Sequence, residues 1–229
     1  MEYRNELKFL VTEQDLALLR FRLLPVMAYD VHQDGDCYSI RSLYFDDMED
    51  SCMRENEAGV DDRRKYRIRI YKKSSEKISM EIKEKFRGFT KKRSCLISRE
   101  ECERYMAGQC PAFRGDMERV AKEFYAAHAA RGMRPVSIVE YERTAFTERV
   151  GNVRVTFDRN IGVSDRTKDF FSESLPLTPV LPAGLHILEV KYDEFLPDYI
   201  AGLLEIGSLR RTSFSKYYLS RINAIQNLV

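Results

Sequence analysis

Charged and apolar residues alternate along several stretches of this chain, and a period of two is typical of strands with one buried face. Arg67, Ile68 and Arg69 are one example, and Glu189 and Lys191, separated by a valine, are another. The alternation between turn residues predicts eight long strands, at residues 2–11, 37–46, 65–71, 77–86, 89–97, 136–146, 153–161 and 186–193.

Helical periods occur between these strands. Thr12, with Asp15 three residues later, predicts an N-cap, and Leu16 and Leu19 begin an apolar stripe that ends before Pro25. Ser98 and Glu101 have the spacing of a capping box, which predicts a short helix that ends near Gly108. Further helices are predicted at residues 47–58 and 115–130 and from about Ser213, the last with apolar residues Tyr217, Leu219, Ile222 and Ile225.

Strands interspersed with helices predict an α+β protein, and we expect one domain over residues 1–229. The charged faces of the strands could either contact water or line an interior. An ordinary half-buried sheet would leave them in water, but such faces usually mix neutral polar residues with both charge signs, whereas here Lys and Arg dominate. A closed antiparallel β-barrel, with cations and a few glutamates inside and helices outside, satisfies both faces.

Positive charge is concentrated in one segment. Residues 63–93 contain fourteen Lys or Arg and only three Glu, although the whole chain has a formal net charge of only +2. Such polarity predicts a polyanionic partner. Arg donates bidentate hydrogen bonds to phosphate oxygens and Lys supplies compact charge, and glutamates among these cations suit a hard divalent metal that bridges phosphates.

The rest of the composition excludes several classes of protein. No apolar run approaches the roughly 20 residues needed to cross a bilayer, and no signal-like segment follows Met1. Five scattered cysteines without C-x-x-C spacing favour reduced thiols and a cytoplasmic location. The three histidines stand far apart, so we expect any chemistry to depend on carboxylates and cations.

Eight short strings, in order along nearly the whole chain, resemble the VTC domain, the polyphosphate polymerase branch of the triphosphate tunnel metalloenzymes, which are CYTH-like proteins. The strings are Arg4-x-Glu6-x-Lys8, Ser42-Leu43-Tyr44-Phe45-Asp46, Arg67-Ile68-Arg69-Ile70-Tyr71, Glu81-Ile82-Lys83, Tyr141-Glu142-Arg143-Thr144-Ala145-Phe146, Val153-Arg154-Val155-Thr156-Phe157-Asp158, Leu188-Glu189-Val190-Lys191 and Ser213-Phe214-Ser215-Lys216-Tyr217.

The resemblance implies an eight-stranded antiparallel tunnel that binds ATP or another triphosphate with Mn²⁺ or Mg²⁺ and transfers the γ-phosphate to a growing polyphosphate chain. By position it implies that the catalytic phosphate ligands are Arg67, Arg69, Lys83, Arg154 and Lys216. Further substrate-binding cations would be Arg4, Lys8, Lys91, Arg93, Arg143 and Lys191. The implied metal ligands are Glu189 first, then Glu6 and Glu81.

Two positions depart from the family pattern. Arg4 stands where the wider superfamily has the first glutamate of a Glu-x-Glu-x-Lys strand, which favours polyphosphate synthesis or binding over triphosphate hydrolysis. Ser213 stands where eukaryotic members carry a lysine, so we expect weaker binding of phosphate at this end of the chain.

Three other functions stay open: a tripolyphosphatase or nucleoside triphosphatase of the same fold, a non-catalytic polyphosphate-binding module, and a nucleic-acid binder. Nucleic-acid binding is disfavoured because the cations alternate with aliphatic residues. A membrane-protein partner for product export is a further expectation.

Overall fold

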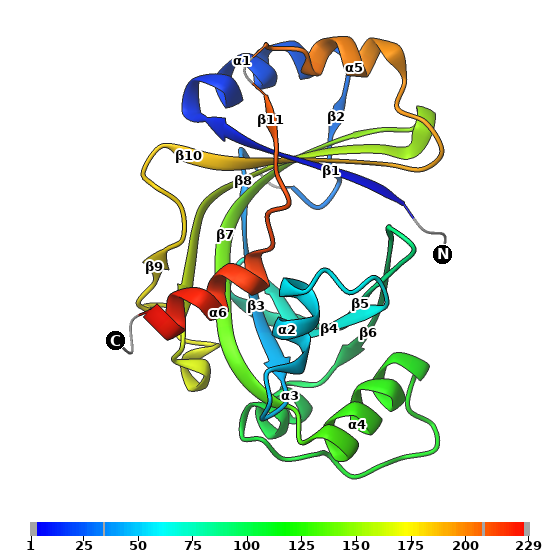
Figure 1. Cartoon of the computed structure of the whole chain (residues 1–229), viewed down its shortest axis with the longest axis vertical. Coiled ribbons are helices and arrows are strands. Elements are labelled where there is room, and N and C mark those ends of the chain that lie inside the picture. The colour runs from blue at the N-terminus through cyan, green and yellow to red at the C-terminus, as the bar shows by residue number, and fades with distance from the viewer. Residues whose placement is uncertain (1–3, 34, 208, 227–229) are drawn as a thin grey trace. The chain divides into compact units, whose positions relative to one another are not determined.

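The computed structural model of the chain describes residues 4–33, 35–207 and 209–226. The chain divides into two compact units (Figure 1). Unit 1 comprises Met1–Ser39, Tyr141–Ile161 and Leu181–Phe214, and unit 2 comprises Ile40–Glu140, Gly162–Val180 and Ser215–Val229. Each unit is therefore assembled from three separate segments of the chain.

The strands belong to a large antiparallel sheet. Its hydrogen-bonded order is β11-β1-β10-β8-β7-β3-β4-β5-β6, with β2 paired to β7 and β9 to β8. Among the described residues no ladder joins β11 to β6, so the order is that of an open sheet. The strands are β1 (Asn5–Thr12), β2 (Ala28–Tyr29), β3 (Tyr38–Asp46), β4 (Arg63–Tyr71), β5 (Ser74–Phe86), β6 (Phe89–Ile97), β7 (Arg134–Glu148), β8 (Val153–Ser164), β9 (Thr178–Pro179), β10 (Leu185–Tyr192) and β11 (Arg210–Arg211).

Unit 1 contains β1 between β10 and β11, with β8 on the far side of β10. One face of these strands carries Leu7, Phe9 and Val11, which belong to an apolar core with Leu188 and Val190. Helices α1 (Glu13–Leu23) and α5 (Asp198–Leu204) contact each other and cover this core (Figure 1). Burial of the apolar face leaves the charged residues of the same strands on the other face.

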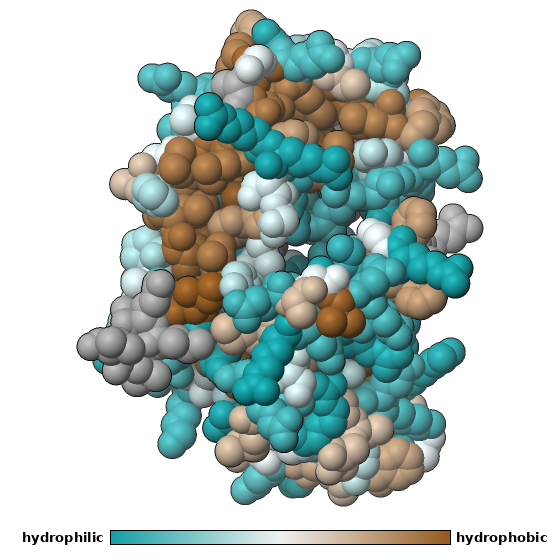
Figure 2. Space-filling view, in the orientation of Figure 1, coloured by the Kyte–Doolittle hydropathy of each residue, from teal (hydrophilic) through white to brown (hydrophobic). Residues whose placement is uncertain are grey.

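Unit 2 contains the meander β4, β5 and β6. Its apolar face packs against α3 (Arg99–Met106) and α4 (Arg119–Arg131). Phe124 of α4 contacts the rings of Phe45, Tyr66 and Tyr105 in edge-to-face geometry, which adds specific contacts to apolar burial. Helices α2 (Ser51–Glu57) and α6 (Lys216–Gln226) contact each other. Figure 2 shows mostly hydrophilic residues over the region of α2, β5 and β6.

The predicted elements agree with the structure in type and order. The predicted N-cap at Thr12 and the predicted capping box of Ser98 and Glu101 are present, Thr12 also forms a capping box with Asp15, and β6 has the predicted bounds. The short helix α5 was not predicted. Glu2 and Tyr3, the predicted start of the first strand, lie outside the described residues, as does the side chain of Ile225.

Two further predictions can be compared with this architecture. All five cysteines are free thiols, as predicted. In the described part of the chain no helix is long and apolar enough to cross a membrane. The single domain over residues 1–229 stays a prediction.

Candidate functional site

In unit 2 the charged face of the meander gathers cations from all three strands. The register pairs Lys65 with Lys83 and Lys83 with Lys92, and in the next row Arg67 with Glu81. Directly paired residues of antiparallel strands project to the same side of a sheet. We call the resulting surface the Glu81 face and define it by Lys65, Arg67, Arg69, Glu81, Lys83 and Lys92.

Glu81 is the only carboxylate of the Glu81 face, and it is fully buried. Its oxygens lie 2.6 Å from a guanidinium nitrogen of Arg67, 3.9 Å from Arg69 and 3.0 Å from Nζ of Lys92. Burial alone would raise the pKa of Glu81, but the charges of Arg67, Arg69 and Lys92 outweigh it and hold that pKa well below its ordinary value. Glu81 is therefore ionised, and it holds the cations in place.

A row of three lysines, Lys65, Lys83 and Lys92, crosses β4, β5 and β6 beside Glu81. Like charges directly opposite one another on neighbouring strands are destabilising. Burial, together with the charges of Arg67 and Arg69, lowers the pKa of Lys92, and Glu81 offsets this only in part. The row is electrostatically unfavourable by itself, and an anion with several oxygens would relieve the repulsion.

Helix α6 fixes one end of this row. Nζ of Lys65 donates hydrogen bonds to Asn56 Oδ1 (2.6 Å) and to Ser215 Oγ (2.9 Å), and it lies 5.7 Å from the ring centre of Tyr217. The hydroxyl of Tyr217 in turn donates to Asp46. Lys216 is the half-buried first residue of α6, directly after Ser215, so it projects from the segment that contacts Lys65.

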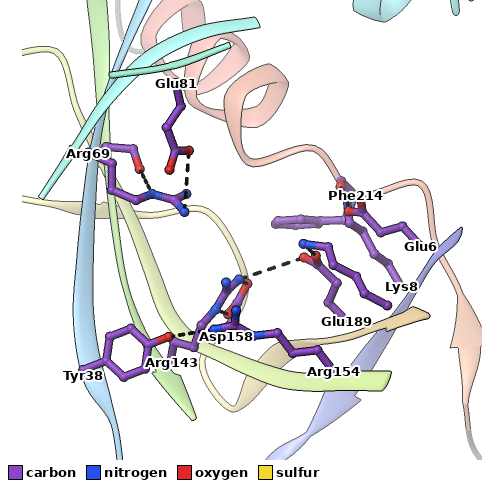
Figure 3. A network of polar contacts seen from close by, with 12 residues as sticks. Glu6, Lys8, Tyr38, Arg69, Glu81, Arg143, Arg154, Asp158, Glu189 and Phe214 are labelled. Atoms are coloured by element: carbon purple, nitrogen blue, oxygen red, sulfur yellow. Dashed lines mark hydrogen bonds and ion pairs between the residues drawn. The ribbon is translucent and has the colours of Figure 1, made fainter. Parts of the chain in front are cut away.

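In unit 1 the charged face of β1, β10 and β8 contains both signs of charge. The register pairs Glu6 with Lys191, Lys8 with Glu189 and Lys191 with Arg154. We call this surface the Glu189 face and define it by Glu6, Lys8, Arg143, Arg154, Asp158, Glu189 and Lys191 (Figure 3 labels all but Lys191).

Arg143 and Asp158 form the most buried ion pair of the Glu189 face. Nε and a terminal nitrogen of Arg143 donate to the two oxygens of Asp158 at 2.6 and 2.8 Å, a bidentate geometry. Burial would lower the pKa of Arg143, but the charges of Asp158, Tyr141 and Glu189 keep that pKa well above its ordinary value. Glu189 lies 4.0 Å from the same guanidinium group (Figure 3).

Lys8 lies among the carboxylates of the Glu189 face. Its Nζ is 2.8 Å from Glu6 and donates to the carbonyl oxygen of Phe214 at 3.1 Å. Burial lowers the pKa of Lys8, but the charges of Glu6 and Glu189 outweigh it, and the net pKa is raised. Lys191 pairs with Glu189, so both glutamates have a lysine neighbour.

Arg154 lies at the edge of the Glu189 face. It pairs with Asp30 at 3.0 Å and donates to the hydroxyl of Tyr38 at 3.2 Å (Figure 3). These contacts fix the guanidinium group. Because it carries five N–H donors, it can still donate hydrogen bonds to a ligand.

The predicted metal ligands differ in how well they fit a cation. No group of three or more His, Cys, Asp or Glu suited to a metal occurs among residues 4–33, 35–207 and 209–226. Glu6 and Glu189 are diagonal neighbours on one face, and Mg²⁺ is commonly held by one or two carboxylates together with substrate phosphates. This pair therefore offers two carboxylates to a cation, although each of them also has a lysine partner. Glu81 offers a single carboxylate between three cations and does not fit.

The structure corrects the placement of two predicted substrate cations. Lys91 and Arg93 project away from the Glu81 face, because their register partners are Glu84 and Ile82. Arg93 instead pairs with Glu84 and with Glu123 of α4. Arg4, by contrast, precedes β1 on the side of Glu6 and Lys8, as alternation predicts, and it pairs with Asp193 at 2.7 Å.

Sequence reasoning missed two members of the Glu81 face, Lys65 and Lys92. A signal for Lys92 is present in the sequence. Gly88 follows Arg87 between two strands, and a two-residue turn at these positions pairs Lys83 with Lys92.

The fold and the two faces define a class: an antiparallel α+β protein with clustered cations suited to phosphate. Residues 3–223 match the family model described as the VTC domain, and the chain belongs to this family. The resemblance of the sequence strings to the VTC domain is thereby confirmed.

Two solved structures of low sequence identity are similar to this chain, and the first shares its fold. A protein from Vibrio parahaemolyticus, named as a proposed adenylate cyclase, superposes with a TM-score of 0.51 at 11% identity, over 95% of this chain and 97% of that one. A second proposed adenylate cyclase, from Bacillus halodurans, gives a TM-score of 0.49 at 11% identity, over 99% of this chain and 89% of that one. Among curated proteins no sequence matches significantly.

Proposed function

We propose that this protein is a metal-dependent polyphosphate polymerase that transfers the γ-phosphate of ATP, or of another triphosphate, to a growing polyphosphate chain. The observation that carries the proposal is the Glu81 face, where three lysines and two arginines share one side of the sheet with a single buried carboxylate. A surface with this excess of cations matches a ligand with many oxygens and a high negative charge.

Phosphoryl transfer requires mainly that the reacting groups are positioned and that their charge is stabilised. Arg67 and Arg69 are held by Glu81, and their remaining N–H groups suit the oxygens of a phosphate chain. Lys83 and Lys92 would add compact charge to the same chain. Because ion pairs with Glu81 fix Arg67, Arg69 and Lys92 before the substrate arrives, we expect little reorganisation of these side chains on binding.

The Glu189 face of unit 1 offers groups that would bind a metal. Glu6 and Glu189 would hold Mn²⁺ or Mg²⁺, which when bound neutralises phosphate charge and polarises the oxygens of the transferred group. Lys8 and Lys191, each beside one of these glutamates, would bind phosphate oxygens. Arg143 would keep Glu189 oriented through the rigid pair that it forms with Asp158.

Other elements of the hypothesis rest on family resemblance. The closed eight-stranded tunnel, the roles of Lys216 and Arg154, the preference for ATP, the cytoplasmic location and a membrane-protein partner for product export all stay predictions. Hydrolysis of triphosphates is the second candidate function, and the carboxylates of the Glu189 face are the observation that favours it, because activation of water also uses a metal-bound site.

The experiment that tests the proposal incubates the purified protein with ATP and MnCl2 and resolves the products by gel electrophoresis and phosphate release. We expect long phosphate chains that acid degrades, and their loss in Glu189→Gln. Glu194→Gln, an exposed glutamate two residues beyond β10, is the matched control. Orthophosphate without polymer would select the hydrolase, and binding of polyphosphate in EDTA without turnover of ATP would select a non-catalytic module.

A further inference from the structure

The side of β4–β6 opposite the Glu81 face borders a hollow of about 520 Å³. Its walls come from β4, β5 and β6 and from α4, all within unit 2. Five cations line it: Arg64, Lys91, Arg93, Arg119 and Arg131. The sheet separates this hollow from the Glu81 face, because side chains alternate along each strand.

Two glutamates arrange the cations of the hollow. Glu123 of α4 accepts from Arg93 at 2.5 Å and from Arg119 at 3.1 Å. Glu84 lies 3.3 Å from Arg64 and 3.5 Å from Arg93. Arg131 pairs with Asp47 at 2.7 Å, so the other four cations face the two glutamates. Each guanidinium group carries five N–H donors, so donor capacity remains after these pairs form. The hollow therefore has one guanidinium group, that of Arg93, held by both glutamates, beside the exposed Arg119, and a local excess of positive charge.

The remaining wall of the hollow is less polar. Tyr66 of β4 and the two alanines Ala126 and Ala127 of α4 line it. A volume of about 520 Å³ lies within the range of roughly 300–1,000 Å³ that small-molecule sites occupy. An inorganic anion would use only the arginines, whereas a compound with an organic part would also contact Tyr66 and the alanines.

We propose that this hollow is a second anion site, which binds a small phosphorylated organic compound. The phosphate contacts Arg64, Arg93 and Arg119, and the organic part lies against Ala126 and Ala127. Arginine suits this role because its planar donors match phosphate oxygens in bidentate pairs. The site is independent of the proposed polymerase activity, since none of its residues belongs to the Glu81 face or the Glu189 face.

Methyl NMR of protein labelled at alanine tests the site directly, with phenyl phosphate as the probe and inorganic phosphate as the comparison. We expect saturable shifts of the Ala126 and Ala127 methyl signals, with phenyl phosphate binding at least threefold more tightly than inorganic phosphate. The double variant Arg64→Ala/Arg119→Ala should weaken binding at least tenfold. Arg104→Ala, an exposed arginine of α3, should leave the titration unchanged.

A Lys92→Ala variant separates the two faces of the sheet. If the probe binds in the hollow, the alanine shifts persist in Lys92→Ala. Shifts that do not saturate, that survive unchanged in Arg64→Ala/Arg119→Ala, or that disappear in Lys92→Ala would overturn the proposal. Failure of the polymerase assay would leave these titrations unaffected, so the two proposals fail separately.

Discussion

Lys83 and Lys92 lie directly opposite each other across β5 and β6, although both side chains are cationic. The pairing follows from the two-residue turn at Arg87 and Gly88, whose φ angles of 50° and 82° are both positive, as a type I′ turn requires. This turn pairs Phe86 with Phe89 and so fixes every later pair of the hairpin. Local hairpin geometry thereby places an unfavourable charge pair next to Glu81.

We predict that Lys92→Ala weakens the binding of tripolyphosphate at least tenfold, because one charge-assisted hydrogen bond is worth roughly 1.5–3 kcal/mol. Lys91→Ala, one residue away on the other face, should weaken it less than threefold. Isothermal titration calorimetry at fixed salt measures both. Lys77→Ala, an exposed lysine of β5, is the control and should bind as the wild type does. Equal losses in Lys91→Ala and Lys92→Ala would contradict the assigned faces.

The lowered pKa of Lys92 predicts how binding depends on pH. A lysine whose pKa lies below its ordinary value of 10.5 loses its charge at a lower pH than an exposed lysine does. Affinity for tripolyphosphate should therefore begin to fall on the acid side of pH 10.5. Lys92→Arg should remove this fall, because arginine stays charged. Titrations over a pH series provide the comparison, and identical profiles of the two proteins would rule out Lys92 as the cause.

Replacement of Glu81 by Gln should destabilise the protein at neutral pH by about 3 kcal/mol, since it leaves buried cations without their counter-charge. The pKa of Glu81 is depressed in the folded protein, so its contribution is complete above the ordinary value of 4.5. That contribution is lost as the pH falls below 4.5 towards the folded pKa. Urea denaturation should show a difference in the free energy of unfolding between the wild type and Glu81→Gln, and this difference should narrow only at acid pH.

Glu76→Gln is the control for that measurement, because Glu76 is an exposed residue of the same strand. Its stability should follow that of the wild type throughout. A gap for Glu81→Gln that stays constant down to strongly acid pH would show that the charge of Glu81 does not act as proposed.

The pair of Arg143 and Asp158 should show strong coupling. We expect a double-mutant cycle with Arg143→Lys and Asp158→Asn to give a coupling free energy of at least about 2 kcal/mol. Either single change leaves a buried charge with a poorer partner. The exposed pair of Arg99 and Glu103, at 2.8 Å on α3, should give about 0.5 kcal/mol or less. Coupling of equal size in the two pairs would contradict a special role for burial.

Much of this organisation follows from local sequence. Alternation correctly grouped Arg67 with Arg69 and Glu189 with Lys191, because the side-chain period of a strand does not depend on its neighbours. Capping boxes could be predicted for the same reason, because they involve residues only three positions apart in the sequence. The position of Lys92 was not obtained in this way, since it depends on the register between two strands and hence on the type of turn at Gly88.

Other features depended on contacts between distant segments. Asp158 acquires its role only through Arg143, fifteen residues earlier, and Lys65 acquires its partners from α2 and from Ser215. Alternation predicts a side for each of these residues and says nothing about the partner. The hollow beside α4 escaped prediction for the same reason, because Arg93 and Glu123 meet only when the helix packs on the strands.

The order in which unit 1 is synthesised has a consequence for its folding. Asn5 in β1 pairs with Tyr192 in β10, and Phe9 pairs with Arg211 in β11. At roughly 5–20 residues per second, a ribosome takes about 10–40 s to make the chain between β1 and these strands. Throughout that interval the amphipathic strand β1 lacks both of its neighbours, so the nascent chain should depend on chaperones that hold unfolded proteins. Stop codons shortly before β10 should therefore yield aggregates rather than shorter folded proteins.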